Sequence, residues 1–162
     1  MKKTLTLSDY QSVAEFRYQI RRFLRFSEEA ARSAGLEARQ YQLLLAIKGL
    51  PQELRPTIGE LAERLQIQHH SAVELVNRLS AGGYIHRQRA SQDRREVLAI
   101  LTPKGERVLH ELVLHHRAEL RLRGPGLIAA LRRVMRVGKH SDKSVTKNAR
   151  RQANRKDSDV RK

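Results

Sequence analysis

Two groups of side chains have types and spacing that suit recognition of a polyanion. The first group occupies the positions left between the apolar residues of a helix-period segment: His69, His70, Ser71, Val73, Glu74, Asn77 and Arg78. The second group follows in a charged segment: Arg87, Arg89, Asp93, Arg94 and Arg95. Guanidinium groups bind phosphates through paired hydrogen bonds, and short polar side chains can hydrogen-bond base edges in a major groove. The chemistry that these residues predict is therefore binding of nucleic acid.

Other chemistries lack their signatures. The chain has no Cys, which excludes disulfides, thiol nucleophiles and Cys-ligated zinc. We find no phosphate-binding Gly-rich loop, no dinucleotide-binding turn and no nucleophile motif. His69 and His70 are adjacent, so on a helix they point about 100° apart and cannot share a metal. The sequence predicts no enzyme, no metal site and no cofactor.

The charge of the chain supports the same class of partner. Among 162 residues there are 33 Lys and Arg against 17 Asp and Glu, a net charge of +16. Residues 139–162 hold nine basic and three acidic residues with few apolar ones, and we expect them to form a disordered basic tail. Residues 1–138 remain basic, with 24 basic and 14 acidic residues. No apolar run is long enough to span a membrane, so we expect no membrane partner and a cytoplasmic, nucleoid-associated protein.

The elements that must position these side chains are mainly helices. Apolar residues at helical spacing predict four of them, over Asp9–Ser33, Ala38–Leu50, 58–65 and His69–Ala81. Ser8 is the expected N-cap of the first helix, with Gln11 completing a capping box. Thr57 is the expected cap of the third, with Glu60 reaching back to the Thr57 amide.

The pattern changes after Gly82-Gly83. Two short β-prone segments flank a charged tip and predict a hairpin. Thr102-Pro103 then starts a long helix, with Thr as N-cap and Pro at the first helical position. We expect that helix to end near Arg123, because Gly124-Pro125-Gly126 follows, and a last short helix to precede the tail.

The helix over His69–Ala81 is expected to dock on the core through one apolar stripe: Ala72, Leu75, Val76 and Leu79. The first group of side chains then points outward and fits a major groove. Ser71 and the free amides of the first turn can hold a phosphate. An Arg at the hairpin tip can enter a minor groove.

At these positions the chain resembles the MarR (multiple antibiotic resistance regulator) family of transcription regulators. The resemblance covers about residues 8–137 and rests on five motifs: Leu61-Ala62-Glu63-Arg64-Leu65, Ala72 to Leu79, Gly82-Gly83-Tyr84-Ile85, Asp93-Arg94-Arg95, and Leu101-Thr102-Pro103-Lys104-Gly105. It implies a mainly α fold with a small β-hairpin wing, in which a winged helix-turn-helix core at about 36–102 is flanked by dimerisation helices at about 8–33 and 103–137.

The resemblance also implies a function. Such proteins are homodimers, usually repressors, that bind palindromic double-stranded DNA, and the Asp matched by Asp93 braces the Arg matched by Arg95. Relatives bind small aromatic or phenolic effectors in a cleft between the dimerisation and DNA-binding parts. The implied dimer gives a role to Phe16, Phe23 and Phe26, which we interpret as interface residues. The alternative reading is a basic protein that binds RNA or DNA without sequence preference.

Overall fold

The computed structural model describes residues 4–89 and 96–136. The chain divides into two compact units, which are described separately. The winged-helix unit comprises residues 24–120, and the arm unit comprises residues 1–23 with 121–162. The expected disordered tail at 139–162 lies outside the described residues.

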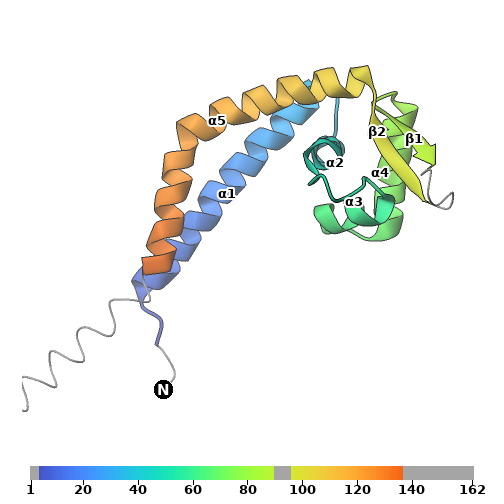
Figure 1. Ribbon diagram of the computed structural model, residues 1–162. Helices are drawn as coiled ribbons and strands as arrows, with labels where there is room; N and C mark the ends of the chain where they lie inside the picture. The colour runs from blue at the N-terminus through green and yellow to red at the C-terminus, as the bar shows by residue number, and fades with distance from the viewer. Residues whose placement is uncertain (1–3, 90–95, 137–162) are drawn as a thin grey trace, which may run out of the picture. The chain divides into compact units, whose positions relative to one another are not determined.

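The described part of the chain is mainly helical with one hairpin, as predicted (Figure 1). Its elements are α1 (Leu7–Ser33), α2 (Ala38–Gly49), α3 (Ile58–Leu65), α4 (His69–Ala81), β1 (Ile85–Arg89), β2 (Val97–Leu101) and α5 (Pro103–Arg136).

The core of the winged-helix unit forms where the apolar stripes of its helices meet. Its largest fully buried side chains come from α2, α3, α4, β1 and α5: Leu43, Leu44, Leu61, Val76, Leu79, Ile85 and Leu112. The helix pair α3 and α4 packs together beside the hairpin in Figure 1. All four residues of the predicted α4 stripe are buried, which confirms the face by which α4 docks.

The hairpin is antiparallel, and its register runs from Ile85 opposite Leu101 to Arg89 opposite Val97. The connection between α2 and α3 lies against the outer side of β2, because Thr57 forms an antiparallel β-bridge with Leu98. The Ala99 amide also donates to the carbonyl oxygen of Pro56 at 2.9 Å.

A buried histidine connects three helices within this unit. His116 of α5 stacks on Tyr41 of α2, with ring centroids 4.7 Å apart, and Phe26 of α1 meets its ring edge-on at 5.5 Å. Because a carbonyl oxygen only accepts, Nδ1 donates to the Leu112 carbonyl at 2.6 Å, which leaves Nε2 to accept from the Ser27 hydroxyl at 2.8 Å. Burial raises the pKa of the Tyr41 hydroxyl. Phe26 therefore serves the core of its own chain.

Both predicted capping boxes need correction. The first helix begins at Leu7, and its capping box is formed by Thr6 and Asp9 rather than by Ser8 and Gln11. The Thr6 amide donates to the Asp9 carboxylate at 2.6 Å, and the Asp9 amide donates to Thr6 Oγ1 at 3.4 Å. A carboxylate is a stronger acceptor than a Gln amide, which favours this box over the overlapping one.

At α3 the prediction is half right. Thr57 Oγ1 accepts from the Glu60 amide at 3.2 Å, as a cap should. The Glu60 carboxylate pairs with Arg64 at 2.9 Å instead of reaching back, and the Thr57 amide donates to the Arg55 carbonyl. The cation one turn on competes successfully for the carboxylate.

The predicted break near Gly124 is wrong, because α5 continues through Pro125 to Arg136. A proline inside a helix costs about 3 kcal/mol, since it removes an amide donor and crowds the preceding turn. The side chains of Leu127, Ala130 and Val134 recur at helical spacing, and each is buried or half-buried within the arm unit. Packing against α1 therefore offsets the cost of Pro125.

The arm unit is a pair of helical segments that run side by side in Figure 1, the start of α1 and the end of α5. Small residues lie at the contact: Ser12 and Ala130 are buried, and Gly126 lies near Gln19. Several large apolar side chains of this unit stay exposed in a single chain: Leu5, Leu7, Tyr10, Val13, Tyr18, Leu122, Ile128, Leu131 and Met135. Phe16 and Phe23 are only half-exposed, so the strongest apolar surface is not the one that the Phe residues predicted.

Candidate nucleic-acid interface

Helix α4 presents the first predicted group of side chains to solvent. Five of the seven residues are exposed, namely His69, His70, Glu74, Asn77 and Arg78. Ser71 and Val73 are half-buried at the edges of that surface. Because the opposite side of α4 is fully buried in the core, the exposed surface is held at a fixed orientation on the winged-helix unit.

The start of α4 is open to an anion. Gln68 is the N-cap residue, and its side chain makes no hydrogen bond to the first turn. The first turn also carries no acidic residue. The first amides of a helix point outward with the positive end of its dipole, so this terminus suits a phosphate.

Arg78 differs from its neighbours because it already has a partner. Its guanidinium lies 3.6 Å from the carboxylate of Glu37, the N-cap residue of α2. Both side chains are more than half exposed, so the pair is weak. The sequence places Arg78 on the outward face, and the fold adds a competing acid from a distant position.

Hydrogen bonds between the end of α4 and the start of α5 hold α4 in place, and the sequence alone did not predict them. Thr102 Oγ1 donates to the carbonyl oxygen of Gly83 at 2.7 Å, and Lys104 Nζ donates to that of Gly82 at 2.8 Å. The Lys104 ammonium also lies 4.2 Å from the centroid of the Tyr84 ring. The Gly105 amide donates to Thr102 Oγ1 at 3.1 Å, which confirms Thr102 as the N-cap of α5. Two of the quoted sequence motifs therefore bind each other.

The hairpin carries part of the second predicted group. Arg87 and Arg89 lie on β1 and are exposed. Asp93, Arg94 and Arg95 lie outside the described residues, so the bracing of Arg95 by Asp93 stays a prediction. Glu96 directly precedes β2, at the end of the hairpin away from its base, and forms an ion pair with Arg55 of the α2–α3 connection at 2.7 Å.

The sequence of this region matches a known family. Residues 34–96, which span α2, α3, α4 and the first strand, match the sequence profile of the MarR family. Over these residues the chain is similar to the MarR family. This segment contains the whole helix pair and the start of the wing, so the family match and the exposed surface of α4 fall in the same part of the chain.

One relative of similar sequence carries the name of a transcriptional regulator. An uncharacterised HTH-type transcriptional regulator of Bacillus subtilis, YsmB, is 31% identical over 65 residues, which are 40% of this chain. That alignment spans 44% of YsmB, less than half of its length.

Solved structures share the fold, among them a MarR family regulator. AbsC, a MarR family transcriptional regulator from Streptomyces coelicolor, superposes with a TM-score of 0.65 at 20% identity, over 75% of this chain and 82% of AbsC. A MepR mutant of S. aureus, solved bound to an oligodeoxyribonucleotide, gives a TM-score of 0.56 at 16% identity, over 93% of this chain and 98% of that one. At such identities the likeness establishes the winged-helix fold alone.

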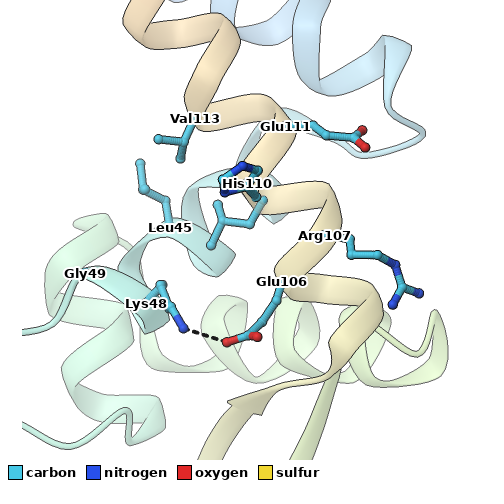
Figure 2. A pocket seen from close by; sticks show the side chains of 9 residues that line it. Leu45, Lys48, Gly49, Glu106, Arg107, His110, Glu111 and Val113 are labelled. Atoms are coloured by element: carbon cyan, nitrogen blue, oxygen red, sulfur yellow. Dashed lines mark hydrogen bonds and ion pairs between the residues drawn. The ribbon is translucent and has the colours of Figure 1, made fainter.

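The winged-helix unit also contains an open cleft of about 620 Å³ between α2 and the first half of α5. Its apolar lining includes Leu45, Leu109 and Val113, and an ion pair between Lys48 and Glu106, 2.6 Å long, lies at its edge (Figure 2). The cleft could hold a small molecule with an apolar body.

Two kinds of feature are absent from the described ranges. Residues 4–89 and 96–136 contain no group of three or more His, Asp or Glu side chains arranged to hold a metal ion. No helix among them is long and apolar enough to cross a membrane.

Proposed function

We propose that this protein is a DNA-binding transcriptional regulator that reads double-stranded DNA with α4. The observation that carries the proposal is the exposed polar surface of α4 on a helix whose other face is buried. A helix of this kind fits a major groove, where its side chains reach base edges. The wing, with Arg87 and Arg89 on its first strand, is proposed to approach the adjacent minor groove.

The phosphate contacts are proposed to come from the start of α4. Its open amides, the half-buried Ser71 and the exposed His69 can bind one backbone phosphate. Such contacts fix the register of α4 on the duplex, whereas Asn77 and His70 are proposed to select bases.

We further propose a homodimer on a palindromic operator. The exposed apolar side chains of the arm unit support this, because side chains such as Leu122 and Met135 are 75% and 69% exposed in a single chain. Covering them with a second copy removes apolar surface from water. Two-fold symmetry then places two α4 helices on two half-sites.

The cleft between α2 and α5 is the proposed site of a small aromatic or phenolic effector that releases the protein from DNA. Its apolar side chains fit an aromatic ring, and Lys48 beside Glu106 offers polar contacts at the edge. A panel of phenols and benzoate derivatives should weaken DNA binding by the parent. Leu45→Trp, which fills the cleft, should bind DNA normally and lose that response. An unchanged response would place the effector elsewhere.

The central experiment is selection of bound duplexes from a random pool, followed by titration of the selected sequence and a scrambled version. We expect a palindromic site and preferential binding of at least about 1,000-fold over the scrambled duplex. Equal affinity for both duplexes would favour the alternative, a basic protein that binds nucleic acid without sequence preference.

A further inference from the structure

Charge is divided very unevenly between the two compact units. The winged-helix unit, residues 24–120, contains 14 basic and 12 acidic residues, a net charge of +2. The rest of the chain contains 19 basic and 5 acidic residues, a net charge of +14. Nearly all of the excess charge therefore lies outside the unit that carries α4 and the wing.

The described part of the arm unit, residues 4–23 and 121–136, shows how that charge is presented. It contains eight arginines, no lysine and two acidic residues, and all eight arginines are exposed in a single chain. Within the described part of the chain, seven of them form no ion pair: Arg17, Arg21, Arg22, Arg121, Arg132, Arg133 and Arg136. In the winged-helix unit, by contrast, the five ion pairs found involve five different cations, Arg25 and Lys48 among them.

Four of the arginines lie on helix faces turned away from the contact between the two helices. Arg17 and Arg21 are four residues apart on α1, as are Arg132 and Arg136 on α5, so each pair shares one helix face. The faces turned toward each other carry the buried Ser12 and Ala130. Between Arg121 and Arg136 the helix rises about 22 Å, the length of six or seven base pairs of duplex.

We propose that this arginine surface binds the phosphate backbone of double-stranded DNA without reading sequence, as a second site separate from α4 and the wing. Guanidinium groups match phosphate oxygens through paired hydrogen bonds, and arginine rather than lysine supplies every cation described here. Only two acidic residues of the described arm oppose a polyanion. The surface does not depend on operator recognition by α4.

The test compares two full-length quadruple variants with the same change in charge. The arm variant carries Arg17→Gln, Arg21→Gln, Arg132→Gln and Arg136→Gln. The control carries Arg32→Gln, Arg39→Gln, Arg107→Gln and Arg117→Gln, all at exposed positions of the winged-helix unit outside α4 and the wing. Fluorescence anisotropy with a scrambled duplex at several salt concentrations gives the affinity and its salt dependence. Sedimentation checks assembly, and thermal melting checks folding. If the quadruple arm variant unfolds, two double variants replace it: Arg17→Gln with Arg21→Gln on α1, and Arg132→Gln with Arg136→Gln on α5.

We expect the arm variant to lose at least about tenfold in affinity for scrambled DNA at low salt. The slope of log K against log salt should fall by about 2 to 4, since each lost phosphate contact removes about 0.9. The control should change much less. Equal losses of affinity in both variants would show that only net charge matters, and would overturn the proposal. Unchanged affinity in both variants would overturn it as well. Loss of binding to phosphatidylglycerol vesicles with unchanged DNA binding would identify a lipid surface and overturn it too.

The ratio of the affinities for operator and scrambled duplex reports base recognition by α4, and not phosphate binding by the arm. An arm variant that keeps this preference while losing its salt slope supports the second site. A parent with no preference would reject the proposed operator reading and leave the arm test intact.

Discussion

The carbonyl oxygen of Tyr84 faces the α-carbon of Gly105 so closely that no β-carbon fits between them. Tyr84 follows the end of α4, and Gly105 lies in the first turn of α5. The hydrogen bonds from Thr102 and Lys104 to the carbonyls of Gly83 and Gly82 lie at the same contact between the two segments. The position of the proposed reading helix is thus set from its C-terminal end by the start of α5.

Gly105→Ala should therefore destabilise the protein. The new methyl group overlaps backbone rather than a mobile side chain, so we expect a loss of about 1–3 kcal/mol in the free energy of unfolding. Gly59→Ala in α3 is the control, because nothing lies within 4 Å of its added carbon. That variant should be unchanged or gain up to about 1 kcal/mol. Denaturant titration measures both, and equal stability of the two variants would contradict the close approach at Gly105.

Asn77→Ala should change which base pairs the protein prefers. A paired contact between an amide side chain and a base edge discriminates by about 1–3 kcal/mol, so the preference at one position of each half-site should relax. Gln42→Ala, an exposed amide on α2, is the control and should leave the preference as it is. A systematic series of operator mutants reads the result. An unchanged series for Asn77→Ala would remove this residue from the reading surface.

Arg95→Ala should weaken operator binding strongly, and Asp93→Ala should weaken it less. The first variant removes the cation proposed for the minor groove, and the second removes only the carboxylate that braces it. Gel-shift titration of both variants at one salt concentration orders them. Parent-like affinity of Arg95→Ala would refute this role for the wing tip.

Leu131→Asp should shift the protein from dimer to monomer at micromolar concentration. Leu131 is 42% exposed in the arm unit, and a carboxylate there would lose its hydration inside an interface. Leu54→Asp, at a loop position that is 37% exposed, is the matched control and should stay dimeric. Sedimentation velocity compares the two. A monomeric parent would reject the dimer itself.

Structural features that depend on a short stretch of chain were predicted correctly in most cases. The bounds of α4 were predicted as observed, since its apolar stripe, its outward polar residues and the Gly82-Gly83 stop all lie within one stretch of chain. The hairpin and the Thr102 cap follow from similarly local signals. The capping box of α1 was missed although its signal, Thr6 and Asp9, is local too, because two boxes overlap and the acceptor strengths of their side chains decide.

Contacts between distant residues could not be read in this way. The pairing of Arg78 with Glu37 and the bond from Lys104 to Gly82 join positions that only the folded chain brings together. Likewise, Pro125 stops a helix by every local rule, yet α5 continues because the following turns pack against α1.

Backbone periodicity and composition are properties of short segments. The residues alone were therefore enough to predict α2, α3, α4, the hairpin, the face that α4 presents and the excess of positive charge. The folded chain sets which charges are paired, which apolar side chains remain exposed and that position 105 must be glycine. Those outcomes depend on distances and burial between segments, and the winged-helix unit pairs five of its cations while the arm leaves its arginines exposed.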